Sequence, residues 1–216
     1  MHDIVLDIGG KIRFDGSRGC ILRICCTHGL SHCADRVFAF HNHHYNATDD
    51  YFKTYNSGRP EGSPMLERGP ADPYEFYKTW FEDNGFPIWP YWENVRSWWA
   101  IRDLPNVLIL HFNDLKADLE GSIRRIAAFL DMPIDEAVFP DIVEHCSFRY
   151  MKAHASDVAP RGGISFKGGA DTFINKGTNG RWRDELTPED IAAYEARALA
   201  ELGEDCAHWV ATGEMP

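Results

Sequence analysis

The 216-residue sequence lacks an apolar run long enough to span a membrane, because charged residues or histidine interrupt every candidate. It is also short of positive charge: 22 Lys and Arg residues face 33 Asp and Glu residues, for a formal net charge of −11. A field of that sign repels nucleic acid, although a local cationic pocket can still hold one nucleotide. No secretory leader is expected, since Asp3, Asp7 and Lys11 follow Met1 closely.

Cysteines paired at metal-binding spacing are lacking too. Six cysteines are present, but none forms the C-x2-C pair typical of a zinc site. The chain is therefore expected to be a cytoplasmic protein with reduced thiols and no metal. A cysteine/histidine metal-binding protein stays the alternative, because cysteines and histidines crowd the first part of the chain: Cys20, Cys25, Cys26, His28, His32 and Cys33.

The remaining composition is that of an ordinary globular protein. Hydrophobic residues make up 44% and charged residues 25% of the sequence, which suffices for one domain with a substantial core. In the first 35 residues, short strands are expected over 4–8, 11–14 and 21–25, with glycine-containing turns between them. The nearly continuous apolar run 107–112 predicts a strand covered on both faces.

Helical signals become clear after residue 35. Asp72 can cap a helix that carries Pro73 in its first turn and ends at Gly85. Capping residues and amphipathic periodicity predict four further helices, which begin at Pro90, near Ile123, after Asp135 and after Thr187. A buried strand followed by amphipathic helices indicates an α/β layered fold whose sheet is small or incomplete.

The segment from Phe173 to Trp182 carries the clearest chemical signal. Its glycines let the backbone approach an anion, while Lys176 supplies positive charge and Thr178 a hydroxyl. Asn175 adds an amide donor, and Trp182 offers a flat wall. Composition alone favours the alternative, a basic surface turn anchored by the tryptophan.

This segment resembles the carboxy-terminal signature of the cytosolic-type sulfotransferases, approximately R-K-G-x-x-G-x-W before a capped helix. Lys176, Gly177, Gly180 and Trp182 match the signature. Asn175 stands where the family usually has arginine, which removes a bidentate phosphate contact. The resemblance implies that the loop wraps the 3′-phosphate of 3′-phosphoadenosine 5′-phosphosulfate (PAPS).

Three further segments resemble the same family in the same order. Residues 107–118 are similar to its strand and Y-E-D-L-K-x-D continuation, 123–130 to its next helix, and 146–152 to its T-S-F-x-x-M-K segment. In the last of these the family's aromatic residue contacts adenine, which implies that Phe148 is a stacking platform. The resemblance, which covers roughly 36–211, gives a cofactor-binding set of Cys146, Ser147, Phe148, Met151, Asn175, Lys176, Gly177, Thr178 and Trp182.

The departures from the family lie toward the beginning of the chain. No P-K-S/A-G-T-T-W loop for the 5′-phosphosulfate and no catalytic histidine are identifiable, so the catalytic residues are unknown. In the family's second phosphate element Asp35 fits, but Ala39 stands at the hydroxyl position. Residues 1–35 are therefore interpreted as an atypical segment, unrelated or misread, before a single sulfotransferase-like domain over 36–216.

Histidines and aromatic residues offer weaker signals. On a helix, His41 and His44 would share one face with His43 turned away. Because no sulfate-holding loop is found, a solvated face or the lining of an acceptor pocket is favoured over a catalytic or metal site. His111 and His145 are expected to be satisfied core or edge residues. An aromatic block is expected to form mostly core, with Trp89 and Trp92 as the pocket members: Trp80, Phe81, Phe86, Trp89, Tyr91, Trp92, Trp98 and Trp99.

The resemblance implies a three-layer α/β fold with a P-loop-NTPase-like parallel sheet and flanking helices, incomplete at the N-terminus. It also implies a sulfotransferase that moves a sulfuryl group from PAPS to a hydroxyl or amine of a small-molecule acceptor. The alternative is a catalytically inactive nucleotide-binding fragment, and weak or no activity is expected of the chain alone. A homodimer is possible but unsupported, since only Thr187 of the family's dimer motif is present.

Overall fold

The computed structural model describes residues 5–6, 11–13, 21–25, 30–85, 90–177 and 180–216. Side chains are described from Val37 onward within those ranges, except that of Arg181. Among the described residues, no helix is both long and apolar enough to cross a bilayer.

The described strands form one four-stranded sheet in the order β1 (Val5–Leu6), β2 (Lys11–Arg13), β3 (Ile21–Cys25) and β4 (Val107–His111). β1 pairs with β2 and β2 with β3 in antiparallel fashion, whereas β3 and β4 run parallel. The predicted P-loop-NTPase-like parallel sheet is thus not confirmed, and the described sheet is mixed. The reason is local, because short connections in the first 25 residues join neighbouring strands and allow only antiparallel pairing.

Strand β4 is the sequence prediction that the structure confirms most fully. Val107, Leu108, Leu110 and His111 are buried, with Ile109 half-buried, so both faces are covered. The parallel register with β3 runs from the Ile21–Val107 pair to the Cys25–His111 pair.

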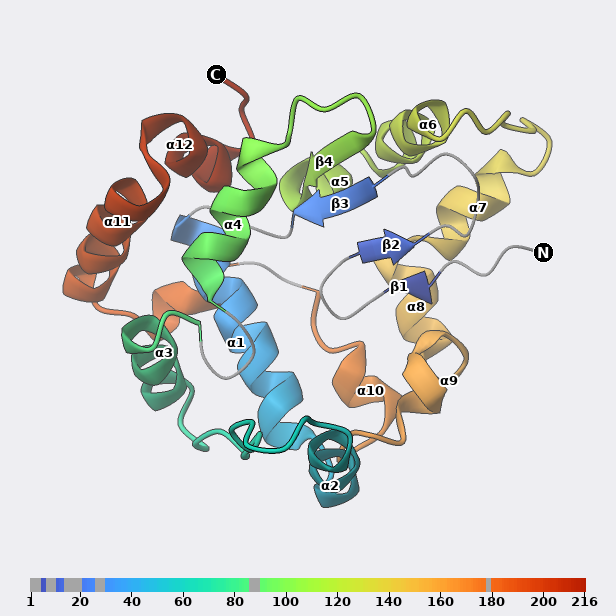
Figure 1. Cartoon of the computed structure of the whole chain (residues 1–216). Coiled ribbons are helices and arrows are strands. Elements are labelled where there is room, and N and C mark those ends of the chain that lie inside the picture. Colours follow the sequence, from blue (N-terminus) through green and yellow to red (C-terminus); the bar gives the residue numbers. More distant parts are fainter. Residues whose placement is uncertain (1–4, 7–10, 14–20, 26–29, 86–89, 178–179) are drawn as a thin grey trace.

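Helices supply most of the remaining structure (Figure 1). They are α1 (Leu30–Asn46), α2 (Asp49–Ser57), α3 (Pro73–Glu82), α4 (Tyr91–Ala100), α5 (Phe112–Ala117), α6 (Leu119–Phe129), α7 (Phe139–His145), α8 (Phe148–Ala153), α9 (Ala155–Val158), α10 (Ala170–Phe173), α11 (Pro188–Leu202) and α12 (Glu204–Thr212). Two 3₁₀ turns lie at Pro160–Gly163 and Arg181–Asp184. The central helix, α1, contacts α3, α10, α11, α12 and the second 3₁₀ turn.

The capping predictions hold at two helices and shift at a third. Asp72 accepts a hydrogen bond from the Tyr74 amide at 2.8 Å, and Thr187 forms a reciprocal capping box with Asp190. Asp135 instead accepts from the Ala137 amide at 2.9 Å, so it closes a turn just before α7.

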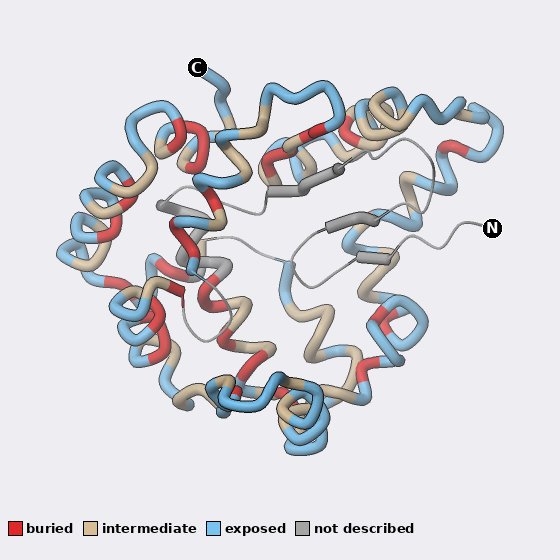
Figure 2. The backbone as a smooth tube through the Cα atoms, in the orientation of Figure 1, coloured by how far each residue is buried: buried red, intermediate tan, exposed pale blue. Residues whose placement is uncertain are grey.

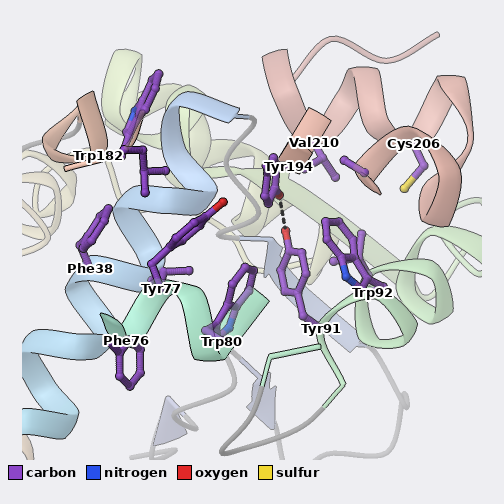
Figure 3. Close-up of a cluster of buried hydrophobic side chains, with 14 of the residues drawn as sticks. Phe38, Phe76, Tyr77, Trp80, Tyr91, Trp92, Trp182, Tyr194, Cys206 and Val210 are labelled. Carbon is purple, nitrogen blue, oxygen red and sulfur yellow. Dashed lines mark hydrogen bonds between the residues drawn. The ribbon is translucent and has the colours of Figure 1, made fainter. Parts of the chain in front are cut away.

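The main core forms where α1, α3, α4, α11 and α12 meet, as the buried stretches in Figure 2 and the side chains in Figure 3 show. Trp80 and Tyr91 are buried in it, which confirms the prediction of core for this part of the aromatic block. The assignment of Trp92 to a pocket in a turn was wrong, because this residue lies inside α4 with 1% exposure. Phe86 and Trp89 lie outside the described residues.

Candidate functional site

Residues 174–177 follow the end of α10 without regular secondary structure. Lys176 is exposed within this segment, and its ammonium has no carboxylate or hydrogen-bond partner among the described residues. A lysine held by no protein anion remains available to a bound one. Asn175 beside it is half-buried, and Thr178 lies outside the described residues.

Gly177 brings two of the predicted site segments together. Its φ is +62°, and a Cβ built there would lie 2.6 Å from Cε2 of the Phe148 ring. Only glycine combines that backbone conformation with such a close ring contact. Phe148, 29 positions earlier in the sequence, therefore packs its ring on the backbone beside Lys176 while remaining 42% exposed.

The other residues of the 146–151 segment lie at the junction of α7 and α8. Ser147 caps α8 by accepting a hydrogen bond from the Tyr150 amide at 3.1 Å. Met151 is half-buried on α8, and Cys146 is exposed at the end of α7, where partial burial of the thiol raises its pKa. Phe148 is the first residue of α8, directly after this cap, and part of its ring remains exposed.

Trp182 lies apart from this group. It is buried in the main core with 8% exposure, near Phe38 of α1 in Figure 3. The Arg183 guanidinium sits over its ring, 4.8 Å from the ring centre. In this position Trp182 anchors the turn that follows the lysine segment, and a direct contact with a ligand stays a prediction.

Two lysines that the sequence reasoning did not select also reach this segment. Lys116 of α5 donates to the Gly177 carbonyl at 3.1 Å, and Lys152 of α8 donates to the Ile174 carbonyl at 2.6 Å. Both lysines belong to segments that resemble the family, but their hydrogen bonds to the 174–177 backbone were not predicted from the sequence. With Lys176, they concentrate positive charge at residues 174–177 of a chain that is acidic as a whole.

The histidines of α1 differ from the favoured prediction of a solvated face. His41 and His44 do share a face, but they are buried, with exposures of 7% and 6%. His41 Nε2 pairs with the Pro70 carbonyl at 2.9 Å, and His44 Nδ1 accepts from the Gly69 amide at 3.1 Å. Burial lowers the pKa of His44 to about 4, helped by the positive charge of Arg68 and by His41. Both imidazoles therefore serve the packing of α1 against the Gly69–Pro70 segment.

The other two histidines behave as expected of core and edge residues. His111 is buried with 1% exposure at the end of β4, where Nδ1 accepts from the Asn113 amide at 3.3 Å. His145 is exposed, with its ring 4.3 Å from that of Tyr150. Within the described part of the chain, no three His, Cys, Asp or Glu side chains gather as metal ligands do. The early cysteine and histidine cluster lies outside the described side chains.

Comparison with known proteins reveals extended similarity to sulfotransferases. Human sulfotransferase 1C2 is 31% identical over 117 residues, which cover 52% of this chain and 38% of the relative. The luciferin sulfotransferase of Photinus pyralis is 29% identical over 146 residues, covering 65% of this chain and 38% of that protein. The matches thus span well under half the length of these curated relatives.

Solved structures show the same relationship at the level of the fold. A mouse sulfotransferase, SULT7A1, solved in complex with PAP, matches with a TM-score of 0.64 and 18% identity, over 89% of this chain and 62% of that one. A retinol dehydratase in complex with retinol and PAP matches with a TM-score of 0.60 and 25% identity, over 85% of this chain and 47% of that one. The family model for the sulfotransferase domain matches residues 36–204, and the chain belongs to that family.

Proposed function

We propose that this chain is the carboxy-terminal part of a PAPS-dependent sulfotransferase and holds the adenine and 3′-phosphate of the nucleotide. The observation that carries the proposal is the contact between Phe148 and Gly177, which joins two segments predicted separately from the sequence. The half-exposed ring thus packs on the backbone next to Lys176, whose ammonium has no partner among the described residues. A stacking surface next to a cation suits a purine nucleotide with an additional phosphate.

The electrostatics of the 174–177 segment support an anionic ligand. Lys116 and Lys152 bond to carbonyl oxygens of the segment, which leaves Lys176 as the lysine free to meet a phosphate. The guanidinium that the family usually places before this lysine is replaced by Asn175, so one charge-assisted contact is missing. Binding is therefore expected to be weaker than that of a site with arginine, by about tenfold for one such contact.

The proposed reaction is transfer of a sulfuryl group to a small-molecule acceptor. An acceptor hydroxyl or amine attacks sulfur, the bond from sulfur to the 5′-phosphate oxygen breaks, and the acceptor proton passes to a base. Catalysis of this kind depends mainly on alignment and on neutralising the charge that develops. The described residues supply the nucleotide end of such a site, and no residue is assigned to the proton transfer.

The acceptor is proposed to be a small organic molecule that carries a hydroxyl or amine. Two retinol dehydratase structures that match this chain were solved with retinol and with androsterone, both small-molecule ligands. Nucleic acid and metal have no place in the proposal, which includes a cytoplasmic location on the strength of the family resemblance.

The proposal extends to the organisation of the chain. The family model begins at residue 36, which supports treating 1–35 as an atypical segment before a sulfotransferase-like domain. If those residues are misread, another reading frame of the encoding DNA restores an Arg/Ser phosphate element upstream of Phe38. If no reading frame encodes such an element, residues 1–35 are a segment unrelated to the family and not a misread one.

A thermal-shift titration tests nucleotide binding. A ligand that binds only the folded state raises the melting temperature, so 3′-phosphoadenosine 5′-phosphate (PAP) should stabilise the chain more than 5′-AMP, which lacks the 3′-phosphate. Equal increases in melting temperature with PAP and with 5′-AMP would contradict the proposal that the chain binds the 3′-phosphate. Sulfuryl transfer from PAPS to a phenol then separates an active enzyme from the alternative, an inactive nucleotide-binding fragment.

A further inference from the structure

Helix α10 ends where the lysine segment begins, and the last carbonyls of any helix lack partners within the helix. α10 has only four residues, Ala170–Phe173, so its own hydrogen bonds hold it weakly. The conformation of Asn175–Gly177 therefore depends on what the carbonyls at the end of α10 bind.

Side chains from two other helices satisfy four successive carbonyls at this point. Lys152 of α8 donates to the Asp171 carbonyl at 3.1 Å and to the Ile174 carbonyl at 2.6 Å. Between them, Asn42 of α1 donates to the Thr172 carbonyl at 3.2 Å. His43 of α1 pairs through Nε2 with the Phe173 carbonyl at 3.0 Å, which makes this nitrogen the protonated one.

Further contacts fix two of these side chains. The Lys152 ammonium also pairs with the Asp171 carboxylate at 2.9 Å. The His43 ring stacks on Phe173 with ring centres 5.1 Å apart and contacts Phe166 at 5.6 Å. We call the three residues Asn42, His43 and Lys152 the carbonyl clamp.

The chain before α10 is tied to the same end of α1. The Lys167 amide donates to the Asn46 carbonyl at 2.7 Å, and the Thr48 amide donates to the Ser165 carbonyl at 2.9 Å. The region 165–174 is thus held against α1 at both ends, so its position follows that of the helix. The clamp is the last fixed point before Asn175, Lys176 and Gly177.

We propose that the carbonyl clamp positions the Asn175–Gly177 segment so that Lys176 meets the 3′-phosphate. The inference rests on the proposed function for the identity of the ligand. The clamp residues are positioning residues, because each bonds to the backbone that carries the site and none is assigned to the ligand. Lys152 contributes most, since one ammonium joins α8, which begins with Phe148, to both ends of the clamped turn.

Two substitutions test the clamp, and a third is the matched control. Lys152→Met removes three contacts together with one charge, whereas Asn42→Leu removes the bond to Thr172 without changing charge. Lys167→Met removes the charge of an exposed lysine in the same region whose ammonium has no partner among the described residues. Lys152→Arg keeps the donors and should restore most of the behaviour of the original chain.

The first readout is hydrogen exchange in the free protein at the Ile174 amide, which donates to the Ala170 carbonyl at 2.9 Å within the clamped turn. Loss of one charge-assisted hydrogen bond corresponds to about a tenfold change in an opening equilibrium. Exchange should therefore accelerate about tenfold in Lys152→Met, to a smaller degree in Asn42→Leu, and not in the control. Unchanged exchange in both clamp variants would overturn the proposal whatever the ligand is.

The second readout is the ratio of the dissociation constants for 5′-AMP and PAP. A positioning role predicts that PAP binding weakens about tenfold in Lys152→Met while 5′-AMP binding changes little, and that Lys152→Arg restores the ratio. If Lys152→Met weakens the binding of PAP and of 5′-AMP equally, the role of Lys152 is merely structural and the proposal is overturned. An unchanged ratio of the two dissociation constants despite faster exchange would also overturn it. If the original chain fails to bind PAP, the proposed function fails, and the exchange experiment still decides the clamp.

Discussion

Acid should destabilise the fold through His44, whose imidazole is buried between α1 and the segment before α3. Its Nδ1 accepts the Gly69 amide hydrogen at 3.1 Å, and Phe40, Phe52 and Phe76 surround the ring. Its Nε2 is buried without a hydrogen-bond partner among the described residues. Burial disfavours the charged imidazolium, and the positive charge of Arg68 adds to this effect, so the pKa of His44 falls from 6.5 to about 4. Protonation would also break the bond from the Gly69 amide.

The difference between the pKa of His44 in the unfolded chain and in the folded chain determines how stability changes with pH. Between pH 6.5 and 4 the unfolded chain binds a proton at this histidine while the folded chain does not, so stability falls as the pH falls. At about 1.4 kcal/mol for each pKa unit, the full loss is about 3.5 kcal/mol, and about 2 kcal/mol of it occurs between pH 7 and 5. The contribution is complete above pH 6.5 and gone below pH 4.

Urea unfolding at several pH values between 7 and 4.5 measures this dependence. His44→Phe keeps an aromatic ring at the position but cannot titrate, so its stability should fall less steeply with acid than that of the original chain. His145→Phe removes an exposed histidine and serves as the control, with the original slope expected. Identical slopes in the original chain and in His44→Phe would refute the reasoning.

The remaining predictions concern one glycine and one helix cap. Gly177→Ala should destabilise the fold by about 1–2 kcal/mol and weaken PAP binding, since it combines a positive φ with a Cβ 2.6 Å from the Phe148 ring. Gly62→Ala, at φ +81° with nothing within 4 Å of its Cβ, isolates the backbone cost, and chemical denaturation of both variants should show the larger loss at Gly177. Thr187→Ala should lower the free energy of unfolding by about 1 kcal/mol through loss of the capping box of α11, and Thr187→Ser should recover most of it. An unchanged midpoint for Thr187→Ala would contradict the role of this cap.

Local sequence signals predicted the parts of the fold that local chemistry determines. Thr187 and Asp190 bond to each other within one turn, so their spacing alone reveals the start of α11. The apolar run of β4 likewise needs no knowledge of its neighbours. The sheet could not be predicted in this way, because pairing between β3 and β4 joins residues more than 80 positions apart.

The candidate site was predicted in part for the same reason. Lys176, Gly177 and Phe148 stand in motifs, so their residue types and order pointed to a nucleotide before any contact was known. The clamp is a property of the folded chain: Asn42 and His43 meet the end of α10 130 positions later, and no spacing encodes that meeting. The burial of His41 and His44 was missed because their partners, at Gly69 and Pro70, are backbone groups that any sequence could supply.

Binding of PAP to the original chain and to Lys176→Ala tests the central claim most directly. Lys176 is the lysine within residues 174–177, and its ammonium is free to contact a phosphate. Lys176→Ala should therefore raise the dissociation constant of PAP about tenfold in calorimetry, whereas Lys167→Ala should leave it nearly unchanged. Equal affinity of the original chain and Lys176→Ala would contradict the assignment of the 3′-phosphate to this segment.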